Sequence, residues 1–333
     1  MNRLRRRAVL RAGVAAVAAA CLPGCSGDGY GGPERSLTVA GGESGGFYLA
    51  FAELLAAEIN AAEPRLRATA RTTEGSLANI DLLRSGQAQL ALVLADTAQA
   101  AGSGELPGGR PTPLRALGRV YENYMQVVVP ANSALHALSD LAGRTMSTGA
   151  PGSGASLFGQ RLLTATGLTT AGAPPTPGRP TSPVTTVQLR LADAVAALTS
   201  GRVDALLWSS GVPTPTLSQL DERLGIRLLP LDSALPPLRA THGAVYERVT
   251  VPAGAYRLVR EVPTVGVANL LLCSPDLPDA VAAAVAAVLV RRAARLVPRE
   301  ASGTQFLDVR TLIGTGGVPL HPGAAAVYRA VHG

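Results

Sequence analysis

The chain has 333 residues and a formal net charge of +7, with 47% hydrophobic and 16% charged residues. This length allows one large or two medium domains, and the apolar content is ample for a core. Five arginines in residues 1–24 account for most of the charge, so the rest of the chain carries only +2. This near-neutral remainder and an aromatic content of 4% argue against a nucleic-acid-binding surface.

The N-terminus predicts export and lipid anchoring. An arginine-rich start precedes the apolar stretch Ala8–Leu22, and Leu22-Pro23-Gly24-Cys25 has the pattern of a bacterial lipobox. We therefore expect residues 1–24 to be a signal peptide and Cys25 to carry lipid, which anchors the protein to the outer face of the cell membrane. Arg6-Arg7 also fits a twin-arginine signal, so that route and the general secretory route both stay open, as does an uncleaved anchor. Residues 25–36 would be a glycine-rich tether.

The first structured unit is predicted from Leu37 to Ala61 as a strand, a glycine loop and a helix. The loop is Gly41-Gly42-Glu43-Ser44-Gly45-Gly46, and apolar residues follow from Phe47 at helical spacing. The glycines permit a sharp turn and a close approach to a ligand. The helix start offers backbone N–H groups and a positive dipole end. We therefore expect an anion- or ligand-receiving loop.

A second helix is predicted after Thr73-Glu74-Gly75-Ser76, with Ser76 as its N-cap. The apolar run Leu90–Leu94 then predicts a buried strand that ends at Ala95-Asp96. Ligand contacts in open α/β sheets lie at the carboxyl ends of strands, so Asp96 is a candidate contact.

The same order of elements recurs further along the chain. A short strand at 144–147 leads into Thr148–Ser156, a glycine loop with hydroxyl groups that include Ser153, and a helix follows. The segment from Ser200 repeats the pattern of the segment from Ser85, 115 residues earlier. We therefore predict an α/β fold of two similar lobes, each a mostly parallel sheet flanked by helices, with a cleft between them. The later elements are predicted as a helix from Pro215, strands at 226–231 and 263–272, and helices at 278–296 and from 322.

Catalytic and metal sites find little support in the sequence. Gly42-Glu43-Ser44-Gly45-Gly46 matches the G-x-S-x-G motif of serine hydrolases, and His321 would follow Ser44 in the chain order of that catalytic triad. The hydrolase fold, however, needs strands and an oxyanion loop before this motif, and the chain ahead of residue 37 is too short to supply them. The four histidines are scattered, and a chain without lysine has no Walker motif. Cys273 is the only cysteine left after Cys21 and Cys25, and its apolar run predicts a buried thiol. We expect no catalytic residue, metal or cofactor.

Eight short motifs together resemble one family, the solute-binding subunits of TRAP transporters in the TAXI branch. The motifs span the chain in order: Gly41-Gly42 through Gly45-Gly46-Phe47-Tyr48, Thr73–Asn79, Leu83–Gly86, Gly149–Gly154, Ser200–Ala205, Gly211–Pro215, Val251–Tyr256 and His321–Ala324. The resemblance implies a type II-like periplasmic-binding-protein fold with strands that cross between the lobes. Lobe I would comprise residues 37–129 and 266–333, and lobe II residues 130–265.

The resemblance also implies a function and a set of site residues. The protein would capture a small organic acid or amino acid, glutamate- and 2-oxoglutarate-like, and deliver it to TRAP permease subunits in the membrane. An orphan sensor without a transporter, or the hydrolase above, are the alternatives. Trp208 departs from the expected pattern and would narrow the cleft. The ligand contacts carried over are Gly45, Gly46, Tyr48, Thr73, Gly75, Ser76, Asp96, Ser153, Gly154 and Gly211, with Tyr48 and Tyr256 covering the ligand.

Overall fold

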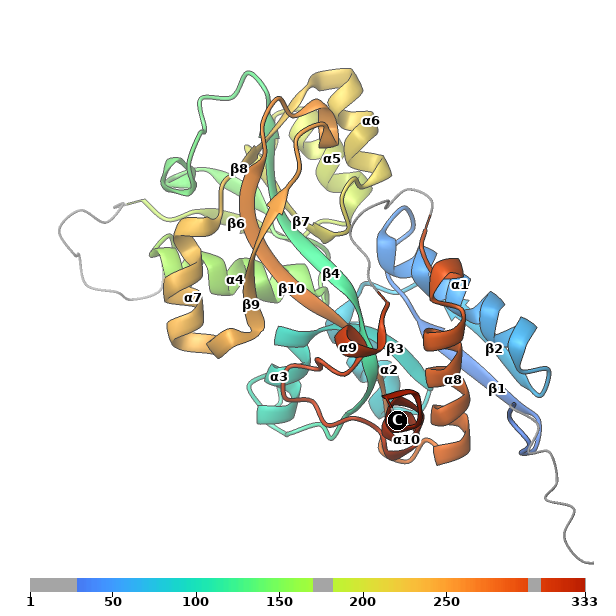
Figure 1. The fold of residues 1–333 in the computed structure, drawn as a ribbon. Helices are drawn as coiled ribbons and strands as arrows, with labels where there is room; N and C mark the ends of the chain where they lie inside the picture. The colour runs from blue at the N-terminus through green and yellow to red at the C-terminus, as the bar shows by residue number, and fades with distance from the viewer. Residues whose placement is uncertain (1–28, 170–181, 299–306, 333) are drawn as a thin grey trace, which may run out of the picture.

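A computed structural model describes residues 29–169, 182–298 and 307–332. One ten-stranded mixed sheet passes through two lobes (Figure 1). In lobe I the strand order is β2 (Leu66–Arg71), β1 (Arg35–Ala40), β3 (Leu90–Leu94), β10 (Val262–Cys273) and β4 (Arg115–Pro130). β1 is parallel to β2 and β3, whereas β10 is antiparallel to β3 and β4.

Lobe II repeats this order with its own strands. β6 (Thr185–Val187), β5 (Thr145–Ser147) and β7 (Ala205–Ser210) are parallel, and β4 pairs antiparallel with β7 and with β8 (Ile226–Leu229). β9 (Tyr246–Val251) pairs with the first half of β10. Each lobe thus has a parallel core that is completed by a strand shared with the other lobe. The predicted two-lobed α/β fold is confirmed.

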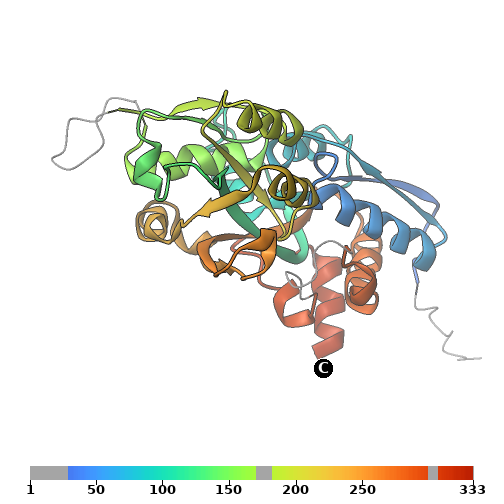
Figure 2. The same cartoon turned by 90° about the horizontal axis from the view of Figure 1, so that it is seen from above.

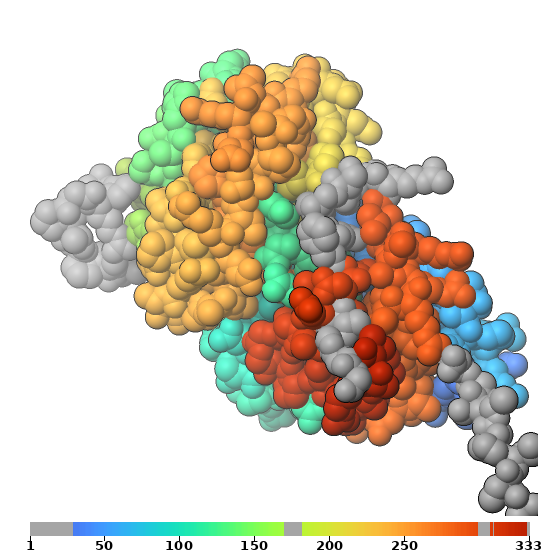
Figure 3. All heavy atoms as spheres, in the orientation of Figure 1, coloured from blue at the N-terminus to red at the C-terminus, as the bar shows by residue number. Residues whose placement is uncertain are grey.

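Two long strands carry the chain between the lobes. Residues 115–124 of β4 pair with β10 in lobe I, and residues 124–130 pair with β7 and β8 in lobe II. The sequence predicts two separate strands here, at 114–120 and 125–129, and that prediction is wrong. Glu122 and Asn123, which lie between the two predicted strands, stay in register with β10 and continue the ladder. In the space-filling view, β4 comes to the surface between the lobes (Figure 3).

Helices lie on both sides of the sheet (Figures 1 and 2). Those of lobe I are α1 (Phe47–Ala62), α2 (Ser76–Arg84), α3 (Ala95–Ser103), α8 (Asp279–Arg291), α9 (Val309–Leu312) and α10 (Pro322–His332). Those of lobe II are α4 (Gly154–Thr166), α5 (Leu191–Thr199), α6 (Pro215–Leu224) and α7 (Leu235–His242). Sequence reasoning missed α3 and α7. α7 has two prolines near its start, a position where the missing N–H costs no helical hydrogen bond.

The repeat seen in the sequence is a repeat of structure. Ser85 and Ser200 end α2 and α5 with nearly the same backbone angles, φ −84° and ψ −2° against φ −87° and ψ −2°. The following Gly86 and Gly201 have φ of 70° and 73°, a left-handed conformation that favours glycine.

Other sequence predictions have mixed outcomes. Cys273 is buried as predicted, and burial raises the pKa of its thiol to about 12. None of the helices in the described residues is long and apolar enough to cross a membrane. The predicted signal peptide and the lipid-anchor residue Cys25 lie outside the described residues. The lobe boundaries after residues 129 and 265 stay predictions.

Candidate functional site

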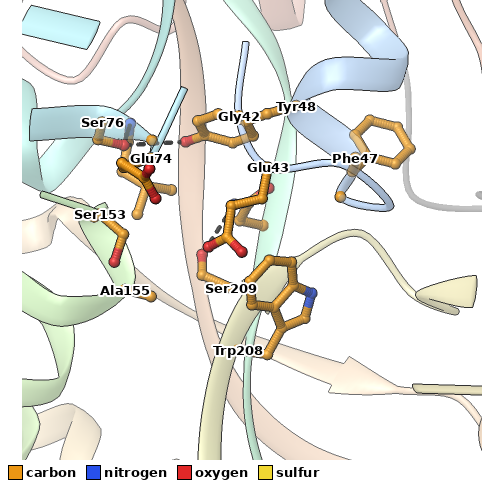
Figure 4. Close-up of a pocket in the computed structure, with 15 residues that line it drawn as sticks. Gly42, Glu43, Phe47, Tyr48, Glu74, Ser76, Ser153, Ala155, Trp208 and Ser209 are labelled. Atoms are coloured by element: carbon orange, nitrogen blue, oxygen red, sulfur yellow. Dashed lines mark hydrogen bonds between the residues drawn. The ribbon is translucent and has the colours of Figure 1, made fainter. Parts of the chain in front are cut away.

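A partly open cavity lies between the lobes, and both lobes line it (Figure 4). Its walls come from the two glycine loops, the starts of three helices and the ends of strands. Lobe I and β4 contribute Gly42, Glu43, Gly46, Phe47, Tyr48, Glu74, Gly75, Ser76, Leu94 and Asn123, and lobe II contributes Ser153, Gly154, Ala155, Trp208 and Ser209.

The helix starts differ in what their backbone amides do. The amides of Leu77 and Ala78 in α2 donate to the carbonyl of Gly152 in lobe II, at 3.0 and 3.1 Å. In α1, the amides of Phe47 and Tyr48 have no partner among the described residues, and the same holds for Gly154 and Ala155 in α4. The starts of α1 and α4 are therefore the positive ends that are available to an anion.

Serine side chains shape these helix starts. Ser153 caps α4, because its Oγ accepts a 3.1 Å hydrogen bond from the amide of Ser156. Ser76 Oγ accepts from the amide of Leu94 at 3.1 Å and lies 3.3 Å from the hydroxyl of Tyr48. Ser76 therefore ties α2 to β3 and α1, and Figure 4 shows it facing Tyr48. The prediction of Ser76 as the N-cap of α2 is wrong, because Gly75 holds that position and the Ser76 hydroxyl is bound to β3 instead.

Two carboxylates of lobe I reach the N-terminus of α5 in lobe II. Glu74 pairs with Arg190, with 3.1 Å between its Oε2 and the arginine Nε and a second contact through Nη2. Glu43 Oε2 accepts from the amide of Leu191 at 2.8 Å. Burial raises the pKa of Glu43, although the hydrogen bond from Leu191 opposes this shift. With the Gly152 contacts, these interactions connect the two lobes across the cleft.

Aromatic rings form the apolar walls. The Phe47 ring packs edge-on against Tyr121, with 4.5 Å between ring centroids. Trp208, within β7, is 7% exposed, and its indole Nε1 is buried without a partner among the described residues. Burial raises the pKa of the Tyr48 hydroxyl, so Tyr48 stays protonated and neutral. Trp208 lines the cavity, and its narrowing of the cleft stays a prediction.

Six of the residues predicted as ligand contacts line this cavity: Gly46, Tyr48, Gly75, Ser76, Ser153 and Gly154. Two others lie close by. Gly45 lines a second, partly open cavity, together with the start of α6. Thr73 Oγ1 donates to the carbonyl of Gly41 at 3.0 Å and accepts from Gly75, so it braces the loop.

Asp96, Gly211 and Tyr256 lie away from the cavity. Asp96 is fully buried, and it accepts a 3.0 Å hydrogen bond from Tyr246 and faces Arg161. The Gly211 carbonyl accepts from Thr214 Oγ1 at 3.0 Å. The Tyr256 hydroxyl accepts from the amide of Thr214 at 2.6 Å, and burial raises the pKa of that hydroxyl to about 12. These residues organise the lobes around the cavity.

The hydrolase pair does not form. Ser44 is exposed, whereas His321 is buried. The two ring nitrogens of His321 are engaged with Leu277 and Gly323, since Nε2 lies 2.8 Å from the Leu277 carbonyl and Nδ1 accepts from the Gly323 amide. His321 therefore braces the start of α10. No group of three metal-ligating side chains occurs in the part of the chain that the structure describes.

The sequence matches the pattern of the NMT1-like family over residues 39–331. The chain belongs to the NMT1-like family. It is similar to the alkanesulfonate-binding protein SsuA from Xanthomonas axonopodis pv. citri bound to MOPS, at 18% identity and a TM-score of 0.47 over 90% of this chain and 84% of that chain. It is also similar to the periplasmic aliphatic sulphonate binding protein SsuA from Escherichia coli, at 17% identity and a TM-score of 0.44 over 90% of this chain and 84% of that chain. A third similar structure is a putative L-cystine ABC transporter from Listeria monocytogenes, at 12% identity and a TM-score of 0.45 over 77% of this chain and 89% of that chain. The assignment to the TAXI branch stays a prediction.

Proposed function

We propose that this member of the NMT1-like family is an exported solute receptor that captures a small organic acid or amino acid between its lobes. One observation carries the proposal: the cavity between the lobes has the starts of α1 and α4 in its wall, with amides that have no partner in the described chain. Such helix starts bind carboxylates without an arginine. Within this class, glutamate- and 2-oxoglutarate-like compounds are the ones that the TAXI resemblance implies.

The closed cleft fits capture by hinge motion. The contacts between the lobes at Gly152, Glu43 and Glu74 all lie at the rim or in the wall of the cavity. A ligand held between the lobes therefore adds its contacts to the ones that favour closure. β4 and β10 connect the lobes and are the natural hinge.

The lipobox and the resemblance to the TAXI branch suggest the location of the receptor and its partners. Lipid on Cys25 would hold the receptor at the outer face of the membrane, where TRAP permease subunits would accept the solute. A sensor that signals to another protein is the second candidate. Uptake of labelled solute into vesicles that contain the permease and the receptor distinguishes transport from sensing.

Thermal unfolding in the presence of amino acids and dicarboxylates tests the receptor function. A ligand at a hundred times its Kd stabilises the folded state by about 2.7 kcal/mol, which raises Tm by a few degrees. Mass spectrometry of the denatured protein reveals any ligand that was retained from expression. A Ser44→Ala variant that binds like the wild type supports the receptor, whereas an esterase activity that Ser44→Ala abolishes would establish the hydrolase instead.

A further inference from the structure

The charges around the cavity define its solute more narrowly. We propose that the solute is an amino acid with one carboxylate and an uncharged side chain, and that Glu43 binds its ammonium group. This inference rests on the proposed function, because it concerns the ligand of the same cleft.

The positive side of the cavity matches one carboxylate. A helix N-terminus acts as about half a positive charge, so α1 and α4 together supply about one. The start of α2 adds little, since its amides at Leu77 and Ala78 are already bound to the Gly152 carbonyl. No arginine is among the residues that line the cavity, and the chain has no lysine. A second carboxylate would therefore find no counter-charge.

The negative side of the cavity has an unused carboxylate oxygen. Glu74 is neutralised by Arg190, but Glu43 has one partner among the described residues, the amide of Leu191 at its Oε2. Figure 4 shows the Glu43 side chain projecting among the residues that line the cavity. A half-buried carboxylate is stabilised by a nearby cation, and an amino acid brings one. A second ligand carboxylate would instead be repelled by Glu43.

The rest of the wall is uncharged. Phe47, Tyr48 and Trp208 offer apolar surface, and Trp208 also has an indole N–H without a partner in the described chain. Beside them, Asn123 donates to Ser209 at 2.9 Å and is itself held by Asn269 at 3.1 Å. Such a surface accepts an apolar or amide side chain, but it lacks a group that would balance a charged one.

Titration calorimetry on the purified full chain tests the inference with ligands of nearly equal shape. Glutamine and glutamate differ by one carboxylate, glutamate and 2-oxoglutarate differ in the ammonium, and leucine and 4-methyl-2-oxopentanoate form a second pair for the ammonium. We expect glutamine or leucine to bind at least tenfold more tightly than glutamate, and each amino acid more tightly than its oxo acid.

Glu43→Gln isolates the carboxylate. The amide oxygen of glutamine can still accept from Leu191, so the contact between the lobes is kept while the charge is lost. We expect this variant to bind the preferred amino acid at least tenfold more weakly, with less than a threefold loss for the oxo acid. Glu34→Gln removes an exposed acid paired with Arg67 and serves as the matched control, with unchanged binding.

The outcomes separate this inference from the proposed function. Glutamate or 2-oxoglutarate binding as tightly as the neutral amino acids, or Glu43→Gln leaving amino-acid affinity unchanged, overturns the inference and leaves the receptor function intact. If no ligand of the panel binds protein that was unfolded and refolded to remove retained solute, the proposed function fails and the inference fails with it.

Discussion

Gly154 of lobe II lies directly against lobe I, so replacing it with alanine tests whether this arrangement of the lobes is the binding form. A Cβ atom at Gly154 would lie 2.6 Å from Leu94 Cδ1 and 2.7 Å from Ser76 Oγ, both in lobe I. These distances are too short for real contacts, and Ser76 is held by Leu94 and Tyr48, so it cannot move away easily. Within lobe II the methyl group meets no such obstacle at its helical backbone position.

We expect Gly154→Ala to weaken binding without unfolding the protein. Overpacking of this kind costs about 1–3 kcal/mol. Because the cost falls on the closed form, it raises Kd by about 5- to 150-fold. The free energy of unfolding of lobe II should stay the same or rise by about 0.5 kcal/mol, since alanine is less flexible than glycine in the unfolded chain. Titration calorimetry with the preferred amino acid measures the first effect, and denaturant unfolding measures the second.

A second glycine provides the control. Gly102 lies in α3 and is exposed, and a Cβ atom there meets nothing within 4 Å. Gly102→Ala should therefore bind like the wild type. Small-angle X-ray scattering without ligand adds a direct measure of closure, and we expect Gly154→Ala to be the more extended protein. Binding within twofold of the wild type and identical scattering would refute the reasoning that closure brings Gly154 against Ser76.

Three further substitutions test the packing around the site. Ser153→Ala removes the cap of α4 and should lower the free energy of unfolding by about 1 kcal/mol in urea titration; an unchanged midpoint would contradict the capping role. Asp96→Ala leaves the buried Arg161 with Glu105 as its one acidic partner among the described residues, beside the Tyr246 hydroxyl. We expect a loss of about 3 kcal/mol by the same method, whereas a loss below about 1 kcal/mol would show that the Asp96–Arg161 pair contributes little. Burial raises the pKa of Glu122 to about 7 from its ordinary value of 4.5, against the opposing effect of Arg119. A carboxyl with a raised pKa in the folded state stabilises the fold at low pH. The difference in free energy of unfolding between the wild type and Glu122→Gln should therefore fall by about 3 kcal/mol between about pH 4 and pH 8. A difference that does not change with pH would contradict the raised pKa.

The parts of the fold that depend on local sequence could be predicted. The strand, glycine loop and helix at residues 37–61 leave a strong local signal, because apolar periodicity and glycine need no tertiary context to be recognised. The crossing strand β4 was missed as a single element, since Glu122 and Asn123 are stabilised by pairing with β10 from far along the chain. Long-range pairing of this kind leaves no trace in a window of ten residues.

The candidate site divides in the same way. Ser153 and Gly154 were predicted because caps and glycines stand out at helix starts. Ser76 lines the cavity as predicted, but it does so as the first residue of α2 and not as its cap. Asp96 was predicted from its place after β3, but its carboxylate turns toward Tyr246 and Arg161, because α3 continues directly from the strand. The importance of Glu43 depends on its distance to Leu191, 148 positions later in the chain, and only the folded structure supplies that distance.

The repeat between the lobes explains why a sequence with few strong motifs still gave the right architecture. β1 ends seven residues before α1 begins, and β5 ends seven residues before α4 begins, so both glycine loops have the same length. The strand edges match as well: the amide of Thr38 donates to the Gln89 side chain at 2.9 Å, and the amide of Thr145 donates to the Asp204 side chain at 2.8 Å. Two copies of the same strand, glycine loop and helix unit place two helix starts on opposite walls of a single cavity. One difference between the copies, the carboxylate of Glu43 in the first loop, gives that cavity a negative side and so a preferred orientation for a zwitterionic ligand.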